Sequence, residues 1–242
     1  MIAVLSDIHG NLEAFKSVLE HMDAEYGSFE AMYCLGDNIG YGPRPEEVCR
    51  LVQERGIVSV MGNHEYAMVK KSGKGWFNPN AKKALSVTER LITKKTREWI
   101  KELPKTIVEH GARFVHGMPP DSLRIYLFEL DDESLANVFY LTSEDIAFVG
   151  HTHELEVVQF SRERVMRSPL EQGTMTLDPE SRYMLNIGSV GQTRDGDNRA
   201  KYVVWDKEKG RLTLHCVEYD IATTVREIEE RGLPEQYARR LW

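Results

Sequence analysis

Three short apolar runs, each followed by a polar loop, dominate the N-terminal third of the chain. The runs cover residues 2–5, 31–35 and 57–60, and stretches with apolar residues at helical spacing follow at 12–21 and 45–55. A continuous apolar run without turn-forming residues is typical of a strand that is buried on both faces. The alternation of such runs with helical stretches predicts a βαβ series and a largely parallel sheet.

Residues 66–102 carry a helical pattern after a break at Gly73 and Gly75. This segment is too long for a simple crossover, so we expect helices packed on the sheet and a loop at 73–78 close to the ligand-binding end. The neighbouring Trp76 and Phe77 allow two interpretations, an aromatic wall that faces a substrate or an aromatic pair packed under the loop.

The second half of the chain is mostly β-structure. Two strands flanking Gly111, at 106–110 and 112–115, have the signature of a hairpin. A helix is expected at 132–139, and two short helices should end the chain at 222–231 and 234–241. The remaining strands are expected at 146–149, 157–160, 174–177, 183–186, 202–205 and 212–217. The sequence therefore predicts an α/β fold, a four-layer α-β-β-α sandwich of two mixed sheets with helices on both outer faces, in a single domain over residues 1–242.

Composition and sequence pattern argue against several classes of protein. A net charge of −7 and a pI near 5.7 argue against a broad surface for long nucleic acid. The three cysteines form no close pair, which predicts neither a disulfide framework nor a cysteine zinc site. No stretch resembles a signal peptide or a membrane span, so we expect a cytoplasmic protein without a membrane partner.

The candidate chemistry lies at the ends of the predicted strands. Five of the eight histidines fall there, together with two aspartates and an asparagine: Asp7, His9, Asp37, Asn63, His64, His116, His151 and His153. The carboxyl ends of strands are where open α/β sheets bind ligands. Taken singly, Asp7 could cap a helix, His9 could be an exposed loop residue and Asp37 could belong to a turn. A carboxylate or imidazole directly after a strand recurs along the chain, and this repetition weakens these separate interpretations.

The residue types suit a pair of metal ions about 3.5–4 Å apart. Nitrogen and oxygen donors without thiolate favour manganese, iron, nickel, cobalt or zinc over magnesium alone. One carboxylate must bridge the two cations, because their repulsion requires shared negative charge. Two histidines separated by one residue, His151 and His153, point in alternate directions along an extended loop and suit two different metals.

Five of these motifs, in this order, resemble the calcineurin-like metallophosphoesterase superfamily, and the similarity is closest to its small bacterial phosphoesterases. The motifs are Asp7-Ile8-His9, Gly36-Asp37, Gly62-Asn63-His64-Glu65, His116-Gly117 and Gly150-His151-Thr152-His153. The resemblance continues through Gly188-Ser189-Val190-Gly191-Gln192 and Arg194-Asp195-Gly196-Asp197, and so covers essentially the whole chain. Two positions depart from it: Ile187 replaces a usual proline, and Met118-Pro119-Pro120 replaces a frequent Ser-Pro-Arg, which removes a potential phosphate-binding cation.

The resemblance implies a role for each residue. It implies that Asp7, His9 and His153 hold one metal, that Asn63, His116 and His151 hold the other, and that Asp37 bridges them. The expected reaction is attack on phosphorus by a hydroxide that bridges the metals. His64 would lie beside the metals without binding them, stabilise the phosphoryl oxygens and protonate the leaving oxygen. Arg194 and Arg44 are candidate substrate-binding residues.

Three functions follow as alternatives. The first is a metal-dependent phosphodiesterase or phosphatase acting on a small phosphate ester. The second is hydrolysis of dinucleoside polyphosphates or of nucleic-acid ends. The third is a non-catalytic, metal-binding scaffold for protein interactions, similar to the retromer subunit of this fold, which the presence of every ligand and of His64 disfavours. Assembly into a homo-oligomer is compatible with each of them.

Overall fold

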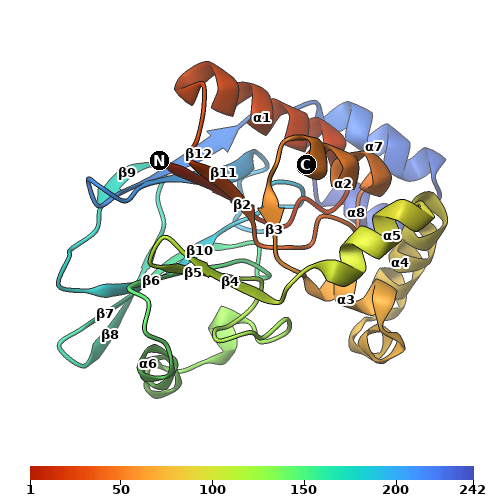
Figure 1. The fold of residues 1–242 in the computed structure, drawn as a ribbon. Helices are drawn as coiled ribbons and strands as arrows, with labels where there is room; N and C mark the ends of the chain where they lie inside the picture. The colour runs from red at the N-terminus through yellow and green to blue at the C-terminus, as the bar shows by residue number, and fades with distance from the viewer.

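The computed structural model describes residues 1–242, which form two six-stranded sheets packed face to face (Figure 1). The first sheet has the strand order β3-β2-β1-β11-β12-β9. Its strands β1, β2 and β3 are parallel, and β11, β12 and β9 continue the sheet in antiparallel pairs. Their bounds are Ile2–Leu5 (β1), Ala31–Cys34 (β2), Val58–Ser59 (β3), Gly173–Thr176 (β9), Ala200–Asp206 (β11) and Arg211–Val217 (β12).

The second sheet has the order β4-β5-β6-β10-β7-β8 and is also mixed. Strands β5, β6 and β10 are parallel, whereas β4 and the β7–β8 hairpin are antiparallel to their neighbours. The bounds are Thr106–Glu109 (β4), Ala112–Val115 (β5), Ile146–Val149 (β6), Leu155–Ser161 (β7), Arg164–Pro169 (β8) and Arg182–Ile187 (β10). The predicted hairpin at Gly111 is confirmed, and His110 and Gly111 both have positive φ, as a two-residue turn between twisted strands requires.

A buried apolar cluster fills the space between the two sheets. It takes Val4 from the first sheet and Phe148 from the second, and its centre includes Tyr33 stacked on Phe114 with ring centroids 3.9 Å apart. Alternate side chains of each strand point into this layer, and the others point to the helices outside.

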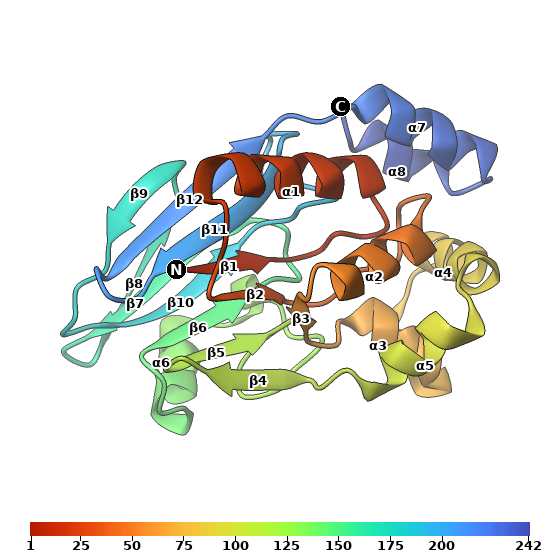
Figure 2. The same ribbon diagram turned by 45° about the horizontal axis from the view of Figure 1, so that its top comes forward.

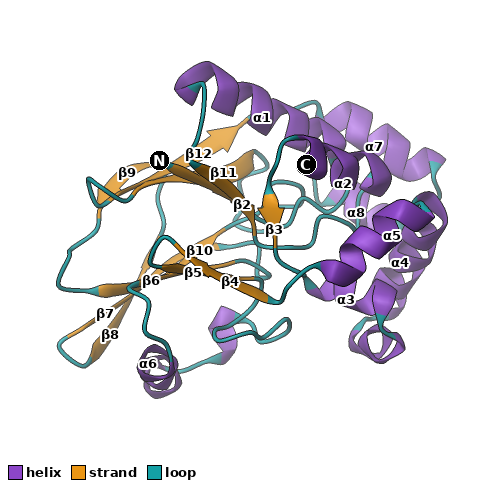
Figure 3. Ribbon diagram, in the orientation of Figure 1, coloured by secondary structure: helices purple, strands orange, loops and turns teal.

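Helices cover both outer faces of the sandwich, which confirms the predicted four layers (Figure 3). Helices α1 (Leu12–Tyr26) and α2 (Pro45–Glu54) lie on the first sheet, and α6 (Asp132–Leu141) lies on the second. The other helices gather at one end of the molecule, where Figure 2 places them beside the carboxyl ends of β1 and β2. They are α3 (Asn63–Val69), α4 (Pro79–Leu91), α5 (Lys94–Glu102), α7 (Ile221–Glu230) and α8 (Glu235–Arg239). None of the helices is long and apolar enough to span a bilayer.

Some local predictions were wrong. The first helix does not end near residue 21 as expected. It continues through Met22 to Tyr26, and Gly27 ends it. Helices α4 and α5 pack mainly on other helices, through clusters shared with α2 and α3 and with α7 and α8. Four elements were not predicted: the short helix α3, the edge strand β8 and two 3-10 helices, Leu127–Glu129 and Lys71–Trp76, the second of which includes part of the loop expected at 73–78.

Candidate functional site

The polar strand ends of the two sheets meet at one end of the sandwich. Asp7 follows β1, Asp37 follows β2, and Asn63 begins the helix after β3. From the second sheet, His116 follows β5, and the loop after β6 supplies two more histidines. Because parallel neighbours end at the same edge, these loops converge. His116 Nε2 lies 3.4 Å from a carboxylate oxygen of Asp37, so the two sheets contribute to one site.

The first group of side chains is Asp7, His9 and His153, all buried and with donor atoms within 4.8 Å of one another. The Nδ1 atoms of His9 and His153 face the backbone carbonyls of Ile39 and Gln192, so each carries a proton there. Both Nε2 atoms then present lone pairs, and they lie only 3.1 Å apart. Asp7 Oδ1, 3.2 Å from His153 Nε2, is buried without a hydrogen-bond partner. Three electron-pair donors directed at one point fit a bound cation.

The second group is Asp37, His116 and His151, with Asn63 beside them. His116 Nδ1 faces the Leu35 carbonyl, and His151 Nε2 faces the Arg124 carbonyl, 3.2 Å away. The remaining ring nitrogens, His116 Nε2 and His151 Nδ1, therefore carry lone pairs and lie 3.1 Å apart. Asn63 Oδ1 is 2.9 Å from His116 Nε2. This group also fits a cation, and the chain thus has two adjacent buried clusters that suit a dinuclear metal site.

Asp37 lies between the two groups. Its Oδ2 atom is 3.7 Å from His9 Nε2 in the first group and 3.4 Å from His116 Nε2 in the second. Its Oδ1 atom accepts a hydrogen bond from the backbone N–H of His64 at 2.9 Å, which fixes the carboxylate plane. A third set of neighbouring donors, His9, Asp37 and His64, overlaps both groups.

Five of the ligand-type residues have a left-handed backbone. The φ angles of Asp7, His9, Asp37, His151 and His153 lie between 52° and 69°. A non-glycine residue in this region costs about 1–3 kcal/mol when the surrounding structure must hold it there. Gly191 shows how tightly the loops are packed, since a Cβ atom on it would lie 1.8 Å from the carbonyl oxygen of Ile8. Such strain concentrated in one place is typical of a functional site.

Burial sets the charges of the site. It lowers the pKa of His9 to about 4 and also lowers the pKa of the other four histidines, so all five rings are in the neutral form that binds metals. Burial, together with the nearby carboxylates of Glu65 and Asp7, raises the pKa of Asp37 well above its usual range. The only basic side chains within 4 Å of the carboxylate oxygens of Asp7 and Asp37 are these neutral histidines. A divalent cation would supply the positive charge that this region lacks.

His64 lies beside the two groups but beneath the surface. Its ring is buried among His9, Tyr41 and Phe77, with centroid distances of 4.6–4.9 Å. Its Nδ1 atom has no hydrogen-bond partner, and its Nε2 atom is 3.9 Å from Asp37 Oδ2. The His64 ring fits here because residue 40 is a glycine. A Cβ atom on Gly40 would lie 2.5 Å from His64 Nδ1.

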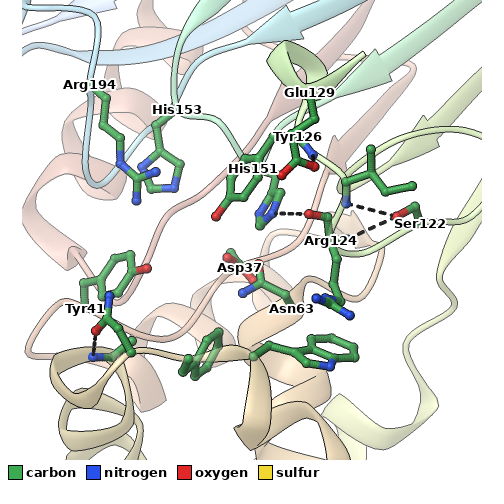
Figure 4. A pocket seen from close by; sticks show the side chains of 15 residues that line it. Asp37, Tyr41, Asn63, Ser122, Arg124, Tyr126, Glu129, His151, His153 and Arg194 are labelled. Atoms are coloured by element: carbon green, nitrogen blue, oxygen red, sulfur yellow. Dashed lines mark hydrogen bonds between the residues drawn. The ribbon is translucent and has the colours of Figure 1, made fainter. Parts of the chain in front are cut away.

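A cavity of about 550 Å³ opens over the two groups (Figure 4). Trp76 and Phe77 line it, in agreement with the substrate-facing interpretation of this aromatic pair. Arg194 also lines the cavity, whereas Arg44 does not: its guanidinium pairs with Glu227 of α7, with Nε 2.7 Å from Oε2. The other lining residues include Tyr41, Asn78, Ser122, Arg124, Tyr126 and Glu129.

Two positioning groups were not identified from the sequence. Glu65 is fully buried and its carboxylate accepts backbone N–H groups from Asp37 (2.9 Å), Asn38 (2.7 Å), Ile39 (3.3 Å) and Gly62 (3.0 Å). It thereby ties the Asp37 loop to the start of α3. The signal was present, since a glutamate three residues after the N-cap residue of a helix is the second half of a capping box.

The second is the fully buried side chain of Lys201 on β11. Its Nζ atom is 2.9 Å from Asp195 Oδ1 and also contacts the Asp197 carbonyl. The same loop is attached to the loop of His151 and His153, because the Arg194 N–H donates to the His153 carbonyl at 3.2 Å. Lys201 thus holds the loop that brings Arg194 to the cavity.

Comparisons with known proteins agree with this geometry. The family model of calcineurin-like phosphoesterases matches residues 1–155, more than half of the chain. An uncharacterised protein of Methanocaldococcus jannaschii is 35% identical over 247 residues, which span 100% of this chain and 97% of that protein.

Solved structures show the same fold. A metallophosphoesterase from Sphaerobacter thermophilus is 32% identical and superposes with a TM-score of 0.85, covering 99% of this chain and 98% of that one. A protein from Pyrococcus horikoshii has a TM-score of 0.82 at 19% identity, with 100% of this chain and 98% of that one covered. The chain therefore belongs to the calcineurin-like phosphoesterase family.

Proposed function

We propose that the chain is a metal-dependent phosphoesterase that hydrolyses a small phosphodiester or phosphomonoester. The observation that carries this proposal is the position of Asp37, whose carboxylate lies between two buried His/Asp groups. A single bridging carboxylate between two sets of nitrogen and oxygen donors suits a dinuclear site of the kind that assists displacement at phosphorus.

In this proposal Asp7, His9 and His153 hold one ion, Asn63, His116 and His151 hold the other, and Asp37 bridges them. The donor set suits manganese, iron, nickel, cobalt or zinc. When bound, the two ions supply an activated water at neutral pH and positive charge for the phosphoryl oxygens.

The remaining steps fall to Arg194, which lines the cavity, and to His64, which is buried beside the two groups. Arg194 extends into it from the side of His153, where its guanidinium can bind a phosphate oxygen (Figure 4). His64 is neutral in the free chain, so it first serves as a hydrogen-bond donor. A negatively charged substrate next to it raises its proton affinity, so the ring takes up a proton from water and, as imidazolium, passes it to the leaving oxygen.

The test is a screen of phosphomonoesters, phosphodiesters and nucleotides with added manganese, accompanied by elemental analysis of protein purified without chelator. We expect turnover of a chromogenic phosphodiester or monoester and close to two transition-metal ions per chain. The matched control is Asp37→Asn, which keeps the side-chain shape but removes the bridging charge, and it should be inactive. Bound metal without turnover of any ester would contradict the proposal and favour a binding scaffold.

A further inference from the structure

The cavity has a second cation that the proposed reaction does not use. Arg124 lines it, and its guanidinium lies over Trp76 with Cζ 4.6 Å from the ring centroid. The Trp76 ring is itself held by Tyr66, which stacks on it with centroids 4.8 Å apart and planes 1° from parallel. No ion pair or side-chain hydrogen bond within the chain engages the guanidinium of Arg124, so its N–H groups remain available to a ligand.

The segment that carries Arg124 is attached to the candidate metal site. The Arg124 carbonyl accepts from His151 Nε2 at 3.2 Å, and Tyr126 stacks on the His151 ring with centroids 4.0 Å apart. Ser122 closes the turn, since its Oγ atom accepts from the N–H groups of Arg124 and Ile125, both at 3.2 Å. These contacts fix the backbone of Arg124 relative to the candidate metal ligands. Its side chain is exposed and extends from that fixed point.

Figure 4 shows Arg124 and Arg194 on opposite sides of Asp37. The guanidinium of Arg194 is thus placed to contact the reacting phosphoryl group beside His153. The guanidinium of Arg124 lies across the cavity, where the rest of a substrate would extend. A volume of about 550 Å³ is in the range of pockets for small organic ligands, roughly 300–1,000 Å³, so a phosphate ion alone would leave it mostly unfilled.

We propose that Arg124, held on Trp76, is a specificity-determining residue that binds a second negative charge on the leaving-group part of the substrate. This inference rests on the proposed function and names its substrate class: organic phosphate esters with two separated anionic groups. The segment Met118-Pro119-Pro120 leaves no cation directly after His116-Gly117. Arg124, farther along the same loop, supplies a cation to the same cavity.

The experiment compares phenyl phosphate with 3- and 4-carboxyphenyl phosphate, which share a ring but differ in the second charge. Steady-state kinetics of the metal-loaded protein would be measured alongside calorimetric binding of each compound. The variant Arg124→Met keeps an unbranched stem over Trp76 and removes the charge. The matched control is Arg240→Met, because the Arg240 guanidinium also lies over an aromatic ring, 6.0 Å from Tyr237, but does not line the cavity.

We expect the wild-type protein to favour at least one carboxylated ester. Arg124→Met should reduce that preference by about 10- to 100-fold, the range for a hydrogen bond to a charged group, mainly through KM. Arg240→Met should leave it unchanged. Equal preference in wild type and Arg124→Met, in both kinetics and binding, would overturn the inference. If no ester is hydrolysed but Arg124→Met still removes selective binding of a carboxylated compound, the subsite stands and the proposed function fails.

Discussion

Replacing Glu65 with glutamine tests whether one buried carboxylate holds the metal-ligand loops together. Each carboxylate oxygen accepts two backbone N–H groups, Oε2 from Asp37 and Gly62 and Oε1 from Asn38 and Ile39. Glutamine can accept at one oxygen only, and its amide group would present hydrogens to the other two donors.

The magnitude follows from the number of donors that lose their acceptor. Two buried N–H groups without partners cost about 1–3 kcal/mol each, or about 2–6 kcal/mol together. Removing a buried charge offsets part of this, because burial raises the pKa of Glu65 and so opposes its ionised form. We expect Glu65→Gln to lower the free energy of unfolding by at least about 2 kcal/mol, a large part of a typical total of about 5–15 kcal/mol. Metal affinity should fall about 10- to 100-fold, as for other groups that orient ligands.

Urea unfolding of chelator-treated protein measures the first quantity, and elemental analysis after dialysis against limiting manganese measures the second. The control is Glu20→Gln on the exposed face of α1, for which a change within about 0.5 kcal/mol is expected. A Glu65→Gln protein as stable as that control and fully loaded with metal would refute the assignment of the loop positions to this carboxylate.

Four further outcomes are expected. His64→Ala should keep its metals but lose about 10²–10⁴-fold in kcat, and less on a nitrophenyl ester whose leaving oxygen needs no proton; loss of metal instead would make His64 a ligand. Asp37→Asn should reduce the metal content from two ions towards one, and an unchanged value of two would contradict bridging. Lys201→Met should destabilise the fold by about 1–3 kcal/mol, the range for losing hydrogen bonds to a charged group, and raise KM by displacing Arg194, whereas Lys209→Met, on an exposed lysine, should do neither. Chelation should lower the melting temperature, and manganese at 100 times its dissociation constant should restore about 2.7 kcal/mol, a gain that calorimetry would detect; an unchanged melting temperature would argue against a resident ion.

The central strands and the convergence of their loops could be predicted because their sequence signals are local. The run Ile2–Leu5 is buried on both faces and has no polar alternation, so it indicated an interior parallel strand, and the polar residues after it had to lie at the sheet's carboxyl end. The same reasoning placed Asp37 and His116, whose proximity the structure confirms.

Other features depend on contacts that the local sequence does not encode. The edge strand β8 is mostly exposed and ends in Pro169, so it lacks both alternation and strand propensity, and only pairing with β7 creates it. The guanidinium of Arg44 is paired with Glu227, 183 positions away in the chain, and no local pattern announces such a partner. The contact of Arg124 with Trp76 was likewise not predictable, although both segments were expected to line the substrate site, since it joins the segment after β5 to the one after α3.

The four histidines of the two candidate metal groups share a further property: the ring nitrogen that faces away from each group contacts a main-chain carbonyl rather than a side chain. These carbonyls belong to Ile39, Gln192, Leu35 and Arg124. Side-chain substitutions at those four positions leave the acceptor in place, so the tautomers of the rings are insensitive to much of the sequence variation around them. The cavity wall, in contrast, is built from side chains. Descendants of this chain can therefore exchange the residues that select a substrate while inheriting the same ligand geometry.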